Sequence, residues 1–92
     1  MSGHEPKFPK TKRSLVFREE DDGAFIFDPI RDELRCTNES GALVFQWLDG
    51  KTSVEDIVKK LNALYPEPDA DSMAKDVHAF IEDLKRRGFI EE

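Results

Sequence analysis

The stretch that decides the fold is residues 38–55, NESGALVFQWLDGKTSVE. Asn38 is a favoured N-cap residue, and the apolar residues after it recur at helical spacing until Gly50, a residue typical of helix ends. Residues 52–55 then have the form of a capping box, in which the Thr52 hydroxyl accepts from the Glu55 amide. We therefore predict two consecutive helices with a glycine-containing turn between them.

Three apolar stripes at helical spacing predict three helices in total. The first helix should place Trp47 in the core, and its stripe consists of Leu43, Val44, Trp47 and Leu48. The second helix should end at Tyr65-Pro66-Glu67-Pro68, and its stripe consists of Val54, Ile57, Val58, Leu61 and Leu64. The third helix should run from near Asp69 or Asp71 to about Arg87, with a stripe of Met73, Val77, Phe80, Ile81 and Leu84. Gly88 suits its C-cap, and the apolar pair Phe89-Ile90 should fold back onto the core.

The residues before Asn38 favour strands instead of helices. Leu15 opens the first strand, and residues 24–27, AFIF, form a second strand of good β-formers after an acidic loop at residues 19–23. Pro29 ends the second strand because proline cannot donate a ladder hydrogen bond. A short third strand follows at residues 33–36, with Leu34 and Cys36 on one face and Glu33 and Arg35 on the other. The predicted fold class is α+β, a three-stranded antiparallel sheet followed by a three-helix bundle.

Length and charge distribution indicate one domain with a basic start. The chain has 92 residues, which is the size of a single domain. Five basic residues against Glu5 give residues 1–18 a net charge of +4, whereas the remainder carries −10. Residues 1–12 hold glycine and prolines without any period, so we expect a mobile tail there and a folded domain at residues 13–92. We interpret the basic start as a solvated tail and not as a nucleic-acid arm, because the acidic body repels phosphates.

Composition and motifs exclude several classes of protein. Cys36 is the only cysteine, which favours a reducing, cytoplasmic compartment, and no apolar run is long enough to span a membrane. We expect Cys36 to be a half-buried strand residue and not a reactive thiol or metal ligand. His4 and His78 are far apart in sequence, so we predict no metal site and no cofactor. The sequence shows no nucleophile–base pair, no paired catalytic carboxylates and no phosphate-binding glycine loop, so we predict that the protein is not an enzyme.

A series of motifs occurs in a definite order and spacing along the chain: Asn38-Glu39-Ser40-Gly41, Asp49-Gly50, Thr52, Val54-Glu55, Ile57, Leu61, Asp76-Val77, Phe80-Ile81, Leu84 and Gly88-Phe89-Ile90. On these residues the chain resembles, from about Lys12 to Ile90, the PqqD-like family, which includes the RiPP recognition elements, the leader-binding modules of ribosomal peptide modification. One position departs from the family pattern. Thr37 stands where the family usually has an apolar residue, most often leucine.

The resemblance implies a winged-helix-like, non-catalytic peptide chaperone. In the family, a leader peptide adds as an extra strand along the third strand and fills a groove against the third helix. The implied partners are the leader of a ribosomally made precursor and a radical SAM modifying enzyme, with the protein itself a monomer or weak dimer. The candidate peptide-binding residues are Glu33, Leu34, Arg35, Cys36 and Thr37 on the third strand and Met73, Asp76 and Phe80 on the third helix.

Two alternatives remain beside the peptide chaperone. Asp76 is equally compatible with a structural role, bonding a strand or loop amide. A winged-helix domain can also bind DNA or act in regulatory protein interactions. The second helix carries Lys59 and Lys60, but Glu55 and Asp56 offset them on an acidic domain, so we predict no nucleic-acid partner.

Overall fold

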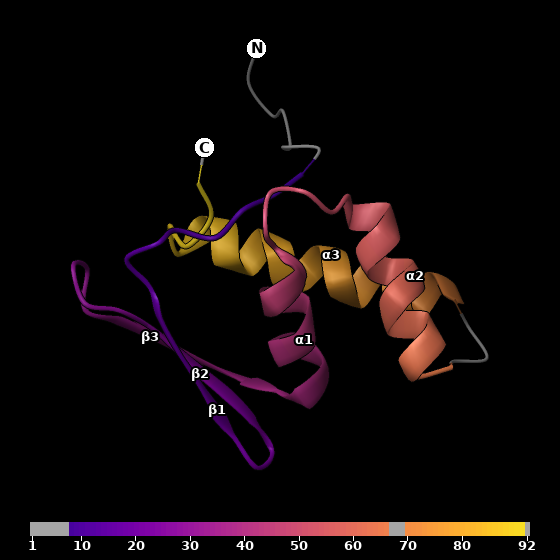
Figure 1. The fold of residues 1–92 in the computed structure, drawn as a ribbon, viewed down its shortest axis with the longest axis horizontal. Coiled ribbons are helices and arrows are strands. Elements are labelled where there is room, and N and C mark those ends of the chain that lie inside the picture. The colour runs from indigo at the N-terminus through magenta and orange to yellow at the C-terminus, as the bar shows by residue number, and fades with distance from the viewer. Residues whose placement is uncertain (1–7, 67–69, 92) are drawn as a thin grey trace.

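The computed structural model describes residues 8–66 and 70–91 and contains a sheet followed by helices (Figure 1). Its elements are β1 (Val16–Glu20), β2 (Gly23–Asp28), β3 (Glu33–Asn38), α1 (Glu39–Trp47), α2 (Val54–Leu64) and α3 (Ala70–Arg86). The three strands form one antiparallel sheet in the order β1-β2-β3. The predicted α+β class is confirmed. One of the two predicted starts of the third helix, Asp69, lies outside the described residues.

The connection between β1 and β2 is tighter than the sequence predicts. Pairing continues to Glu20 and Gly23, so only Asp21 and Asp22 remain in the turn, not the whole of residues 19–23. Two-residue turns are the commonest connections in β-hairpins. Gly23 is needed next to this turn, because a Cβ there would lie 1.9 Å from the Thr37 carbonyl oxygen on β3.

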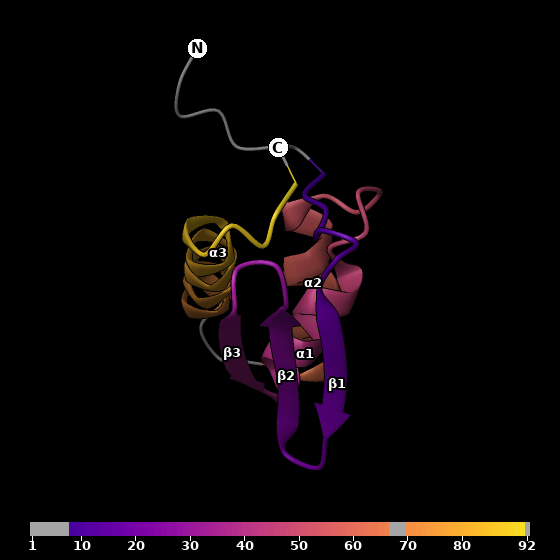
Figure 2. The same ribbon diagram turned by 90° about the vertical axis from the view of Figure 1, so that its left-hand side faces the viewer.

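The sheet packs against the helices with one face and leaves the other uncovered. Figure 2 shows the uncovered face toward the viewer, with α1 and α2 behind the sheet and α3 alongside β3. Side chains alternate along a strand, so Arg35 and Thr37 point to the helix side while Leu34 and Cys36 point outward. Cys36 is exposed, so the prediction that it is half-buried is wrong. The reason is that no helix covers the face on which it lies.

Hydrogen-bonded caps begin α1 and α2. Asn38 Oδ1 accepts from the Gly41 amide at 2.8 Å, which confirms the predicted N-cap of α1. The N-cap of α2 is Ser53 and not Thr52, because Ser53 Oγ accepts from the Asp56 amide at 3.1 Å. The N-cap is therefore displaced by one residue from the predicted Thr52.

The end of α3 is closed by two backbone hydrogen bonds. The Gly88 amide donates to the Lys85 carbonyl at 3.0 Å, and the Phe89 amide donates to the Leu84 carbonyl at 2.9 Å. This pair is the Schellman arrangement, and Gly88 allows it through its φ of 78°. Both Phe89 and Ile90 are buried, so the predicted return of the chain onto the core is confirmed.

The N-terminal segment is partly built into the domain. Residues 1–7 of the predicted mobile tail lie outside the described residues. Beyond them, β-bridges join Lys10 to Asp49 and Thr11 to Ile90. The prediction of a free tail is therefore wrong for this last part of the segment. Its backbone supplies hydrogen-bond partners to the turn after α1 and to the chain end after α3.

The core lies between β2 and the three helices. One residue of the predicted stripes is exposed: Leu64, in the last turn of α2, has 58% of its surface accessible. Trp47, which was predicted to lie in the core, is only half-buried and packs against the edge of the cluster. The other half-buried stripe residues that pack against the cluster are Leu43, Val54, Val58 and Phe80. The buried cluster consists of Ile26, Val44, Phe45, Leu48, Ile57, Leu61, Met73, Val77, Ile81, Leu84, Phe89 and Ile90.

Candidate functional site

A groove with a volume of about 560 Å³ runs between β3 and α3. The start of α1 closes one side of it, and Leu61 from α2 reaches its base. Its lining residues are Arg35, Cys36, Thr37, Asn38, Ser40, Gly41, Val44, Leu61, Asp76, Val77, Ala79, Phe80 and Asp83. The groove therefore has backbone on the strand side, apolar side chains below and polar side chains along the helix.

The strand side of the groove is a sheet edge. In a two-residue hairpin the closing pair, here Glu20 and Gly23, is hydrogen-bonded, and the bonded pairs then alternate along each strand. By this alternation the backbone groups of Phe25 and Phe27 on β2 form their hydrogen bonds with β1. The residues opposite them on β3, Cys36 and Leu34, therefore form no backbone hydrogen bond with β2. The amides and carbonyls of these two β3 residues point toward the free edge. An unpaired edge of this kind is a template for an added strand.

The floor of the groove is apolar. Val44, Leu61 and Val77 are buried beneath it, and Phe80 is half-buried on its helix side. Gly41 allows α1 to approach β3 closely, because a Cβ at this position would lie 1.8 Å from Thr37 Oγ1. The floor can therefore accept an apolar side chain that enters from the strand edge.

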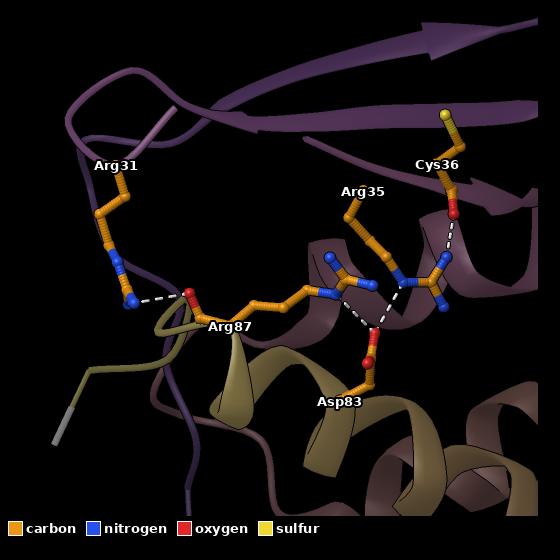
Figure 3. Close-up of polar contacts among 5 residues, drawn as sticks. All are labelled: Arg31, Arg35, Cys36, Asp83 and Arg87. Carbon is orange, nitrogen blue, oxygen red and sulfur yellow. Dashed lines mark hydrogen bonds and ion pairs between the residues drawn. The ribbon is translucent and has the colours of Figure 1, made fainter. Parts of the chain in front are cut away.

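One end of the groove is closed by a polar bridge between β3 and α3. Arg35 Nε donates to Asp83 Oδ2 at 2.7 Å, and Arg87 Nε donates to the same oxygen at 3.0 Å. Figure 3 shows both guanidinium groups converging on this carboxylate, with Arg31 bound to the Arg87 carbonyl oxygen at 2.9 Å. A guanidinium nitrogen of Arg35, Nη1, also donates to the Cys36 carbonyl oxygen.

The two arginines control the charge state of Asp83. Partial burial alone would raise its pKa, but the hydrogen bonds from Arg35 and Arg87 outweigh burial and hold the pKa below its usual value. Asp83 is thus ionised whenever the bridge is formed. Arg35 also lies over the Phe80 ring, with 5.4 Å from its guanidinium carbon to the ring centroid.

The structure brings together five of the eight residues predicted for the site, and these are Arg35, Cys36, Thr37, Asp76 and Phe80. Glu33 and Leu34 belong to β3 but do not line the groove, and Leu34 faces outward. Met73 is a core residue, only 7% exposed, so it is not available on the groove surface. Met73 lies one helical turn before Val77, and its side chain belongs to the buried cluster.

Sequence reasoning missed Asp83 and the α1 side of the groove. Asp83 lies seven residues after Asp76 and three after Phe80, so helical spacing puts all three on one flank of α3 and was a usable sequence signal. The contributions of Ser40, Gly41 and Leu61 had no such signal. They depend on how α1 and α2 pack against the strand.

Three comparisons with known proteins bear on the family and on the fold of this chain. The family profile described as Coenzyme PQQ synthesis protein D (PqqD) matches residues 23–90. A PqqA binding protein from Acinetobacter baylyi (strain ATCC 33305 / BD413 / ADP1) is 36% identical over 53 residues, which are 58% of this chain and 52% of that protein. The match thus spans about half the length of that curated relative.

Two solved structures share the architecture. TbiB1 in complex with the TbiA(beta) leader peptide aligns with a TM-score of 0.77 at 20% identity, covering 89% of this chain and 94% of that one. Lasso peptide synthetase B1 complexed with the leader peptide aligns with a TM-score of 0.78 at 22% identity, covering 92% and 99%. These likenesses confirm the predicted winged-helix-like fold. Because the family profile spans residues 23–90, which is more than half of the chain, this protein belongs to the PqqD family.

Proposed function

We propose that this protein binds the leader of a ribosomally made precursor peptide and presents it to a modifying enzyme. The leader adds as a fourth strand along the free edge of β3 and places side chains in the groove against α3. The observation that carries this proposal is the combination of an unpaired strand edge with an adjacent apolar groove. Backbone hydrogen bonds supply affinity in this mode of binding, and the groove supplies selectivity.

The relatives support the same function. The curated relative is named for binding PqqA, and both solved structures of similar fold hold a leader peptide. In this chain the binding residues we propose on β3 are Arg35, Cys36 and Thr37, together with the backbone of Leu34. On α3 they are Asp76 and Phe80, to which the structure adds Asp83.

We further propose that the protein has no catalytic step of its own. It works in the cytoplasm, as a monomer or weak dimer, by raising the effective concentration of the precursor near a radical SAM enzyme, which carries the chemistry. Within residues 8–66 and 70–91, no three His, Cys, Asp or Glu side chains are grouped to hold a metal ion, and His4 lies outside these ranges. Over the same residues, the structure has no helix of the length and apolarity that a membrane crossing requires.

A backbone titration tests the proposal. The 15N-labelled protein is mixed with synthetic leader segments of small precursor peptides encoded near its gene. We expect saturable shifts at residues 34–37 and along Asp76, Phe80 and Asp83 on α3, since these residues line the edge and the groove. The same titration with duplex DNA is the control for the winged-helix alternative. If DNA shifts the resonances of α2 and no leader segment causes any shift, the protein binds DNA and not a leader peptide.

Proline substitutions distinguish strand addition from side-chain binding. Leu34→Pro removes an amide that points to the free edge, so we expect loss of leader binding with the helical circular dichroism retained. Arg35→Pro instead removes an amide that pairs with Ile26 on β2, so we expect it to lower the stability of the sheet as well.

The matched control for these variants is Leu34→Ala, which shortens an exposed side chain but keeps the amide. It should bind leader segments nearly as well as the original protein. If Leu34→Pro also binds with unchanged affinity, the leader does not add to β3 as a strand.

A further inference from the structure

Arg35 blocks part of the strand edge on which the proposed function depends. Its Nη1 donates to the Cys36 carbonyl, which is one of the groups that point to the free edge of β3. An added strand needs this carbonyl for one of its own amides. Binding must therefore displace the Arg35 nitrogen, and a displaced guanidinium N–H that finds no new acceptor weakens the complex.

The two arginines at this end of the groove have more donors than their carboxylate can use. Arg35 and Arg87 each contact Asp83 through Nε only, and both contacts fall on one oxygen, Oδ2. Within residues 8–66 and 70–91, the Nη groups of Arg87 have no hydrogen-bonded acceptor. Glu33 lies on the same face of β3 as Arg35 but forms no ion pair with either arginine in these ranges. The nearby Asp28 carboxylate accepts instead from the backbone amides of Ile30 and Arg31.

The geometry of an added strand brings a specific ligand position to this cluster. In an antiparallel arrangement, which continues the pattern of this sheet, the ligand residues opposite Arg35 and Thr37 form the non-hydrogen-bonded pairs. Their side chains stand close to those of β3 and point toward α3. The ligand residue opposite Thr37 enters above Val44 and Val77, and the one opposite Arg35 meets the guanidinium groups.

We infer that the groove selects a precursor segment of the form apolar–any–acidic, in which the acidic side chain binds Arg35 and Arg87. The apolar residue precedes the acidic one because an antiparallel ligand passes Thr37 before Arg35. The ligand carboxylate accepts hydrogen bonds from the guanidinium N–H groups that do not bind Asp83. It also accepts one from Arg35 Nη1, which the ligand backbone displaces from the Cys36 carbonyl oxygen. This inference rests on the proposed function and names the class of peptide that the same groove takes.

Because the protein is acidic overall, a preference for an acidic ligand residue would identify a local contact. The chain carries −6 in total, so long-range electrostatics disfavours an acidic ligand and favours a basic one. A preference for an acidic residue at one position must therefore come from local contacts. No general attraction between the protein and its ligand produces it.

Synthetic peptides with a constant serine–threonine frame test the inference by fluorescence anisotropy. Their centres are Leu-Thr-Glu, Leu-Thr-Gln, Leu-Thr-Lys and the reversed Glu-Thr-Leu. We expect Leu-Thr-Glu to bind about tenfold more tightly than Leu-Thr-Gln, the difference expected for one charge-assisted hydrogen-bonded contact, and the other two to bind more weakly still. In Arg35→Gln, the preference for Glu over Gln should disappear.

Two further measurements locate the effect. Arg18→Gln makes the same change at an exposed arginine on β1 and should keep the full preference. The side-chain Nε resonance of Arg35 should shift with Leu-Thr-Glu more than with Leu-Thr-Gln. Equal binding of these two peptides, together with leader binding at β3, would overturn the inference and leave the proposed function intact. If neither these peptides nor any leader segment binds, both are wrong.

Discussion

At the scale of single residues, Phe89 shows how a residue outside every helix and strand can hold the core. It is the largest fully buried side chain in the described part of the chain. Its amide donates to the Leu84 carbonyl, and its own carbonyl accepts from the Lys12 amide at 3.0 Å. The ring therefore lies where the end of α3 and the N-terminal segment meet.

We expect Phe89→Ala to lower the free energy of unfolding by about 3–5 kcal/mol, the range for a deleted core ring. A folded domain has about 5–15 kcal/mol in total, so this loss is a large fraction of its stability. Trp47→Ala should cost clearly less, because Trp47 is half-buried and its ring faces the ammonium of Lys60 at 5.5 Å. Urea unfolding followed by circular dichroism measures both variants. A larger loss for Trp47→Ala would contradict the core described above.

At the scale of elements, the start of α2 depends on one hydroxyl group. Ser53→Ala should lower the free energy of unfolding by about 1 kcal/mol, because the Asp56 amide loses its acceptor. Thr52→Ala should cost less, since the Thr52 hydroxyl donates to the exposed Asp49 carboxylate at a distance of 3.4 Å and caps no helix amide among the described residues. Ser53→Thr keeps a capping hydroxyl and is the matched control. Chemical denaturation of the three variants would show the reverse order if Thr52 were the cap.

At the scale of the whole molecule, the Asp83 bridge is a pH-sensitive link between the sheet and α3. The folded-state pKa of Asp83 is depressed, so its ionised form favours folding at pH values above its unfolded pKa of about 3.9. This contribution is lost as the pH falls through the folded pKa, because the unfolded chain takes up the proton first. We expect the stability difference between the original protein and Asp83→Asn to shrink as the pH falls below about 4.

Urea unfolding at a series of pH values measures that difference. Asp22→Asn is the control, because Asp22 is an exposed carboxylate in the turn between β1 and β2 and takes no part in the bridge. A difference for Asp83→Asn that stays constant down to the acid limit would show that the bridge does not depend on the charge of Asp83.

The elements were predictable because their causes are local. Asn38 caps α1 through an amide three residues away, and Gly88 ends α3 through bonds within the same turn. The apolar periods of α2 and α3 likewise depend on residues a few positions apart. Errors arose where two local solutions compete, as at Thr52 and Ser53, which are adjacent hydroxyl residues that can both begin a helix.

The candidate site was predictable only in part. Arg35 and Phe80 were placed in it by resemblance, and the structure does bring them together, 5.4 Å apart across the groove. Met73 was included because its spacing on α3 cannot separate the core-facing flank from the strand-facing one. Asp83, on the correct flank, was missed although it holds Arg35 in place.

The sequence by itself determined the order and type of the elements, the single-domain size and the acidic surface, because composition, periodicity and caps act over a few residues. Only the tertiary structure decided which residues meet. Arg35 and Asp83 are 48 positions apart, the N-terminal segment pairs with the chain end after α3, and Phe17 stacks on Phe45 at 4.9 Å. Such contacts follow from how the elements pack around one shared core, and no local pattern in the chain encodes that packing.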